Sequence, residues 1–237
     1  MPYKAVLFDA NLTLWEWPGD SAETVFGVLH FLEKPTDLDQ VKKAFERVET
    51  DWFIPRLLEV ETGGRGISLE EARSLVRRRD VELLKRLDIP DRTGLVRSAI
   101  QTAFSSRKPA LYPDVAPLIH QLWEQGIKMA VVSNGWQQEY DAGRLGIAGY
   151  FGAIVGSAHV GYKKPMPEIF QQALEKLAVA PEDAVHVGDH YEEDVLGAQG
   201  AGVEAVLLRR NGDGRREDVQ TITSLSELLA IIDSSSP

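Results

Sequence analysis

The sequence predicts an α/β protein in which helices cover both faces of a parallel five-stranded sheet, with an α-helical cap inserted after the first strand. After Tyr112, short apolar runs alternate with stretches of helical periodicity, an order typical of parallel strands joined by helices in three layers. Between about residues 20 and 106 the pattern is almost wholly helical and charged. One apolar run precedes this helical block and the others follow it, so the block is inserted between the first strand and the rest of the sheet.

Five short apolar runs have the pattern of buried strands. They are Lys4–Asp9, Lys128–Ser133, Ala153–Gly156, Ala184–Gly188 and Glu204–Leu208. Ligands of parallel α/β sheets bind at the carboxyl ends of the strands. Polar residues that follow these runs are therefore the first candidates for a functional site.

The helices follow from apolar residues that recur every three or four positions. In the inserted block we expect Ser21–Leu32, Asp37–Val60 (bent or broken near Pro55), Ser68–Leu87 and Asp91–Phe104. Elsewhere we expect a helix from Val115 that Gly126 closes, then Gln137–Leu145, Pro167–Ala178, Glu192–Ala201 and Ser224–Ile232. Ser68 with Glu71, and Ser224 with Glu227, have the spacing of capping boxes. Residues 1–15 and 107–237 should form the core domain, and residues 16–106 the cap.

Charge and cysteine content limit the classes of function. The 26 basic and 36 acidic side chains give a net charge of −10, and such a chain repels the phosphate backbone, so we expect no nucleic-acid partner. The chain has no cysteine, which excludes thiolate nucleophiles and cysteine-bound metals and fits a reducing compartment. We find no signal-peptide core and no membrane span, and we expect a cytoplasmic protein without a membrane partner. The oligomeric state stays open.

Four polar clusters carry the chemistry. They are Asp9-Ala10-Asn11-Leu12-Thr13, Ser133-Asn134-Gly135, Lys163-Lys164-Pro165 and Gly188-Asp189-His190-Tyr191-Glu192-Glu193-Asp194. A carboxylate can attack phosphorus, further carboxylates suit Mg²⁺, and hydroxyl and ammonium groups hold phosphate oxygens. The clusters therefore predict a site for a phosphoryl group, with Asp9 as nucleophile and Mg²⁺ as cofactor.

In their order and spacing these clusters resemble those of the haloacid dehalogenase superfamily of hydrolases, over nearly the whole chain. The fourth, within VGDHYEEDVLGAQGAG, is the most specific. The helical block is similar to the C1-type cap of that family. The resemblance implies a Rossmann-like five-stranded sheet with the first strand in the middle. It also implies phosphatase-like, Mg²⁺-dependent hydrolysis of small phosphorylated metabolites through an aspartyl-phosphate.

The resemblance implies a role for each matching side chain. Asp9 matches the nucleophile, and Lys164 matches the lysine that balances the charge of nucleophile and phosphate. Thr13 and Ser133 match hydroxyls that contact phosphate, and Asn134 is a further candidate for substrate binding.

A second set of residues is implied for the metal. Asp189 matches a direct metal ligand, and Asp194 matches the acid that supports either the metal or Lys164. Asp9 and the backbone carbonyl of Asn11 complete the candidate ligands.

Three residues depart from the family's phosphatase pattern, and one of them is Met166, which stands where an aspartate often follows Lys-Pro. Such phosphatases usually carry an aspartate two places after the nucleophile, as acid and base, and here that place is Asn11. An amide does not exchange a proton near neutral pH, so about 10²–10⁴-fold of general acid–base assistance is missing. Leu12 replaces the usual glycine. We expect either substrates with good leaving groups, such as acyl phosphates, or another acid, with His190, Glu192 and cap residues as candidates.

Two other functions stay open. One is hydrolysis at carbon by Asp9, as in the (S)-2-haloacid dehalogenases, which the missing second aspartate favours and Asp189 disfavours. The other is a catalytically weakened protein that keeps only phosphate binding. Halide release that a chelator does not affect would identify the first, and binding without turnover the second.

Overall fold

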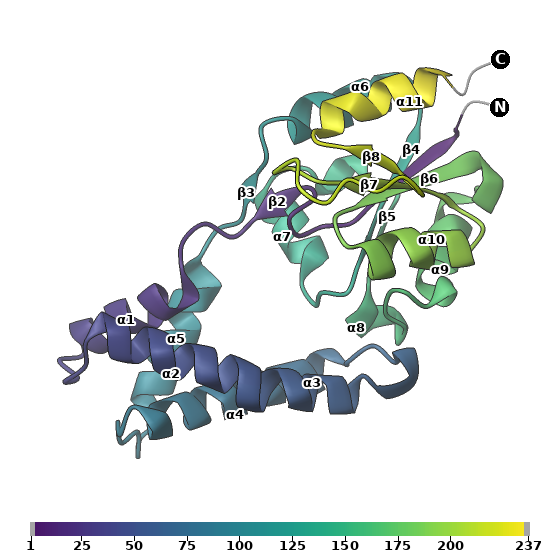
Figure 1. The fold of residues 1–237 in the computed structure, drawn as a ribbon. Helices are drawn as coiled ribbons and strands as arrows, with labels where there is room; N and C mark the ends of the chain where they lie inside the picture. Colours follow the sequence, from purple (N-terminus) through teal and green to yellow (C-terminus); the bar gives the residue numbers. More distant parts are fainter. Residues whose placement is uncertain (1–2, 235–237) are drawn as a thin grey trace. The chain divides into compact units, whose positions relative to one another are not determined.

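The computed structural model describes residues 3–234, which divide into two compact units (Figure 1). One contains the chain up to Glu16, Gly64–Gly66 and the chain from Pro109 onward; the other contains Trp17–Gly63 and Ile67–Lys108. The first is built on a sheet and the second from helices. None of the helices within residues 3–234 combines the length and the apolar character needed to cross a bilayer.

Six parallel strands form the main sheet, in the order β5-β4-β1-β6-β7-β8. They are β1 (Ala5–Phe8), β4 (Lys128–Ser133), β5 (Ala153–Gly156), β6 (Ala184–Gly188), β7 (Glu204–Leu208) and β8 (Gln220–Ile222). The five predicted strands are present, and the count of five is corrected to six. β8 escaped prediction because it has three residues of which Ile222 alone is buried, too short for an apolar run.

Each face of the sheet has its own apolar cluster because successive strand residues point to opposite faces. Phe8 of β1 packs in a cluster with α6 (Val115–Glu124) and α11 (Leu228–Ser234). Leu7 packs in another with α9 (Pro167–Leu177) and α10 (Gly197–Gly200). Figure 1 shows these helix pairs on opposite sides of the sheet. The predicted three layers are confirmed.

Smaller elements complete this unit. α7 (Gln138–Arg144) follows β4, and α8 (Ser157–Val160) follows β5. β2 (Trp15–Glu16) and β3 (Ala110–Leu111) form a separate antiparallel pair.

The helical unit contains α1 (Ser21–Phe31), α2 (Leu38–Val48), α3 (Ile54–Val60), α4 (Leu69–Arg86) and α5 (Leu95–Ser106). The predicted capping box of Ser68 and Glu71 is present at the start of α4. A π-helical turn, Glu49–Phe53, separates α2 from α3. Pro55 is the second residue of α3, directly after this π-helical turn, and it has no N–H to donate to that turn. The irregularity therefore precedes Pro55.

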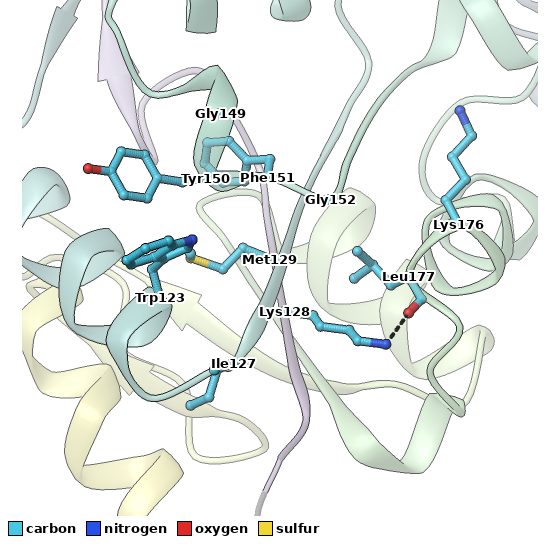
Figure 2. Close-up of a pocket in the computed structure, with 11 residues that line it drawn as sticks. Trp123, Ile127, Lys128, Met129, Gly149, Tyr150, Phe151, Gly152, Lys176 and Leu177 are labelled. Atoms are coloured by element: carbon cyan, nitrogen blue, oxygen red, sulfur yellow. Dashed lines mark hydrogen bonds between the residues drawn. The ribbon is translucent and has the colours of Figure 1, made fainter.

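A hollow of about 510 Å³ opens at the amino-terminal end of β4 (Figure 2). Trp123 and Tyr150 meet edge to face along one side of it. The ammonium of Lys128 donates to the carbonyl of Leu177 at 2.7 Å, so this cation closes the last turn of α9. The polar clusters singled out in the sequence lie at the other end of the strands.

Candidate active site

The sheet places the candidate residues along one edge. Asp9 comes directly after β1, Asp189 directly after the neighbouring β6, and Ser133 ends β4 on the other side of β1. Lys164 lies between α8 and α9, and Asp194 lies in a π-helical turn, Tyr191–Leu196, that follows β6. Segments far apart in sequence thus meet at the carboxyl ends of the central strands.

Lys164 joins two carboxylates in the protein interior. Its Nζ lies 2.6 Å from Oδ1 of Asp9 and 2.6 Å from Oδ1 of Asp194. Lys164 and Asp194 are each 1% exposed, and Asp9 is 7% exposed. Burial alone would lower the pKa of Lys164, but the two carboxylates outweigh burial and raise it. The ammonium is therefore charged at every ordinary pH.

The acidic side chains form a compact group. Asp9, Asp189 and Asp194 each offer a carboxylate oxygen, and these atoms lie within 4.8 Å of one another. Burial, together with repulsion from Asp194 and Asp189, raises the pKa of Asp9 to about 6 although Lys164 opposes the rise. Burial and then Asp194 raise the pKa of Asp189. The group has three carboxylates and one ammonium, that of Lys164, so a further cation would be favourable there. Carboxylate oxygens are ligands that Mg²⁺ prefers.

Asp194 differs from its two neighbours. Burial would raise its pKa, but Lys164 and then His186 hold the pKa well below the usual range. The oxygen Oδ2 accepts the backbone N–H of His190 at 2.9 Å. A Cβ at Gly188 would stand 2.1 Å from Cγ of Asp194, so this position accepts only glycine without a shift of the carboxylate.

The predicted substrate-binding residues have different surroundings. The Asn134 amide receives the backbone N–H of Lys164 at 2.6 Å and donates to its carbonyl at 3.0 Å, so it holds the lysine's backbone. The Ser133 hydroxyl accepts the N–H of Gly135 at 3.3 Å. The Thr13 hydroxyl is buried and has no hydrogen-bond partner within residues 3–234.

Asn11 and Leu12 are exposed in the loop after β1. Leu12 has φ of 62°, in the left-handed region where a side chain is strained and glycine is not. This conformation is the physical reason for a glycine at that place.

Arg210 and His186 were missed by the sequence analysis. Arg210, which follows β7, donates to the carbonyls of Leu12 and Thr13 at 3.3 and 2.6 Å and pairs with Asp114 at 3.0 Å. Its position at the carboxyl end of a strand was the available signal. His186 lies inside β6, where its Nε2 is 3.0 Å from Oδ1 of Asp194. A histidine within an apolar strand gives no sign of its partner.

A short strap, Gly64–Gly66, runs beside the segment that leads into Lys164. The N–H of Gly66 donates to Gly161, and the N–H of Lys163 donates to Gly64. A Cβ at Gly66 would stand 2.3 Å from the carbonyl oxygen of Ser157. The absence of a side chain there allows this approach of the two backbones.

Comparison with known proteins shows the family of the chain. A family model described as haloacid dehalogenase-like hydrolase matches residues 3–202. The glyceraldehyde 3-phosphate phosphatase of Methanopyrus kandleri is 38% identical over 147 residues, which are 58% of this chain and 60% of that protein. The ribulose-1,5-bisphosphate 5-phosphatase of Halopiger xanaduensis is 30% identical over 206 residues, 86% of this chain and 84% of that protein. The match thus spans about three fifths of the length of the Methanopyrus protein.

Solved structures share the fold. The HAD-hydrolase YfnB of Bacillus subtilis, bound to magnesium, has a TM-score of 0.73 and 21% identity, and the match covers 98% of this chain and 100% of that one. A 2-haloacid dehalogenase from Pseudomonas syringae pv. Tomato has a TM-score of 0.67 and 24% identity, with coverage of 98% and 99%. The same fold therefore carries proteins with different names and activities.

Proposed function

Because the chain belongs to the haloacid dehalogenase-like hydrolase family, we propose that it is a Mg²⁺-dependent phosphatase of small phosphorylated metabolites with Asp9 as its nucleophile. The observation that carries this proposal is the buried bridge of Lys164 between Asp9 and Asp194, next to Asp189. A nucleophilic carboxylate, a fixed ammonium and a further carboxylate at one strand edge suit transfer of an anionic group. Phosphatases among the relatives support the same class of substrate.

The reaction we propose has two displacements at phosphorus. A carboxylate oxygen of Asp9 attacks the phosphorus, and the bond to the leaving oxygen breaks as the aspartyl-phosphate forms. Water then attacks the same phosphorus, which releases phosphate and restores the carboxylate. Lys164, fixed 2.6 Å from Asp9, balances the negative charge that collects beside this carboxylate. Thr13 and Ser133 supply hydroxyls for the phosphate oxygens.

The acidic group is the proposed metal site. Asp9, Asp189 and the backbone carbonyl of Asn11 would hold Mg²⁺, with Asp194 as the remaining acidic candidate. When bound, the ion supplies positive charge to the phosphate oxygens.

The leaving group limits the choice of substrate. The amide of Asn11 has no proton acidic enough to transfer, so we propose that the enzyme prefers esters and anhydrides whose leaving group departs unprotonated, acyl phosphates first among them. His190 and Glu192 are the alternative acids. Nδ1 of His190 lies 3.5 Å from a carboxylate oxygen of Glu192, and both side chains are more than half exposed.

The test is phosphate release with Mg²⁺ from acyl phosphates, nucleotides and sugar phosphates, including glyceraldehyde 3-phosphate and ribulose 1,5-bisphosphate. We expect turnover of acyl phosphates, no turnover by Asp9→Asn, and loss of activity with a chelator. Asn11→Asp should extend activity to poorer leaving groups, by up to about 10²–10⁴-fold.

Other outcomes point elsewhere. Halide release from 2-haloacids in the presence of chelator would assign a dehalogenase. Micromolar binding of phosphate or vanadate without turnover, unchanged by Asn11→Asp, would assign a binding protein. Phosphate release that survives Asp9→Asn would refute the nucleophile.

A further inference from the structure

His186 is a fully buried histidine on the central strand β6, where it stands opposite Leu7 of β1. The ring of Phe170 meets its imidazole edge to face, with ring centres 5.0 Å apart. A polar ring in such surroundings loses its hydration and is tolerated when a hydrogen bond replaces it. The role of His186 therefore depends on which group forms a hydrogen bond with its ring.

That partner is Asp194. Nε2 of His186 lies 3.0 Å from Oδ1 of Asp194. The same oxygen lies 2.6 Å from the ammonium of Lys164, as an ionised carboxylate does, and a carboxylate only accepts hydrogen bonds, so we assign the proton of this bond to Nε2. The other ring nitrogen, Nδ1, is buried and has no partner within residues 3–234. The hydrogen bond to Asp194 is thus the polar contact that fixes the ring.

The oxygen that His186 contacts is also the oxygen that holds Lys164. Lys164 in turn reaches Asp9, while Oδ2 of Asp194 receives the backbone N–H of His190. These three contacts of the Asp194 carboxylate all come from donors of the protein. A buried chain runs from His186 through Asp194 and Lys164 to Asp9.

We propose that His186 is a positioning residue, which fixes the Asp194 carboxylate so that Asp194 holds the Lys164 ammonium against Asp9. In this arrangement Asp194 binds Lys164 and not the metal, and Mg²⁺ would be bound by Asp9, Asp189 and the Asn11 carbonyl. The kinetic consequence rests on the proposed function, because it requires Asp9 to be the nucleophile. The hydrogen-bond geometry does not depend on it.

Matched amide variants separate positioning from filling of the core. In His186→Gln the amide nitrogen comes near the place of Nε2, whereas in His186→Asn it comes near the place of Nδ1. With acyl phosphate and Mg²⁺, His186→Asn and His186→Phe should lower kcat about 10–100-fold with little change in KM, and His186→Gln should recover most of kcat. Equal losses in Gln and Asn variants of equal stability would overturn the proposal.

A spectroscopic measurement tests the geometry without turnover. In ¹⁵N-labelled protein, long-range ¹H–¹⁵N spectra should show a histidine ring N–H at Nε2 that exchanges slowly with water. The signal should be absent from His186→Gln and shifted in Asp194→Asn. A proton on Nδ1 of His186, or a rapidly exchanging Nε2 proton, would overturn the assignment.

Calorimetric titration with Mg²⁺ decides which group Asp194 serves. We expect the Mg²⁺ dissociation constant to change by less than about threefold in His186→Asn, because in our proposal Asp194 does not bind the metal. If Asp194 were a metal ligand, loss of the histidine that supports it would change the constant about 10–100-fold. A change of that larger size would assign Asp194 to the metal and overturn the proposal. If no phosphate ester is turned over, the proposed function fails, while the spectra still decide the His186 contact.

Discussion

Lys164→Met would keep an unbranched apolar side chain of nearly the same length and remove the ammonium that Asp9 and Asp194 share. At 2.6 Å and an effective dielectric constant near 20, each ion pair is worth about 6 kcal/mol before desolvation. Burial of the ammonium cancels part of this gain, and breaking a buried pair from one side costs about 3–5 kcal/mol. We therefore expect the free energy of unfolding at pH 8 to fall by about 3–5 kcal/mol.

The loss should shrink toward low pH. Burial already raises the pKa of Asp9 to about 6, and the pKa rises further once the opposing Lys164 is gone. A carboxyl with a higher pKa in the folded than in the unfolded protein binds its proton more tightly when folded. Its cost is therefore fully present above the folded pKa, shrinks as the pH falls below that value, and is gone only below the unfolded pKa of 3.8.

Urea unfolding at pH 5 and pH 8, without divalent cations, measures both effects. Lys176→Met on α9 is the control, because it removes the same charge from an exposed position. The double variant Asp9→Asn/Lys164→Met should regain part of the lost stability at pH 8. A loss below about 1 kcal/mol at pH 8, or one that does not depend on pH, would refute the reasoning.

Three further changes can be tested by thermal or urea unfolding. Leu12→Gly should raise the free energy of unfolding by about 0.5 kcal/mol because glycine adopts the positive φ at this position without strain. Leu12→Ala keeps a Cβ and should not raise it. Gly188→Ala should cost about 1–3 kcal/mol and abolish phosphate release, because its Cβ displaces Asp194; full stability with full activity would contradict this. Burial raises the pKa of Asp141 to about 6 against the pull of Arg144, so its charged form destabilises the fold above that pH. Asp141→Asn should therefore add about 1 kcal/mol at pH 8 and nothing below pH 4, with exposed Glu139→Gln as control.

Much of the fold was predictable because burial on both faces leaves a local mark in the sequence. The run AVHVG of β6 and the run KMAVVS of β4 could be identified from apolar character alone. β8 could not, because three residues at the edge of the sheet with one buried side chain leave no such mark. Pro55 drew attention to the right region, but the sequence pattern did not show that a π-helical turn precedes it.

Candidate side chains were predictable from residue type and their place after strands, whereas their partners were not. Asn134 follows β4 and is expected at the substrate, and that expectation stays a prediction; the hydrogen bonds of its amide with the backbone of Lys164 could not be read from the sequence. For Asp194 the sequence left two roles open, support of the metal and support of Lys164. Its partners Lys164 and His186 come from the loop before α9 and from β6, and the sequence does not show that these segments meet.

The sequence by itself determined the family, the parallel sheet, and which carboxylates and lysine are the candidates for the site. These follow from residue type, spacing and apolar patterns, which are local properties of the chain. The tertiary structure alone decided the bridge from Lys164 to Asp9 and Asp194, the bond from His186 to Asp194, and the positive φ of Leu12. These depend on distances of a few ångströms between segments that are remote in sequence or on backbone angles in a loop, and neither is encoded in a pattern of neighbouring residues.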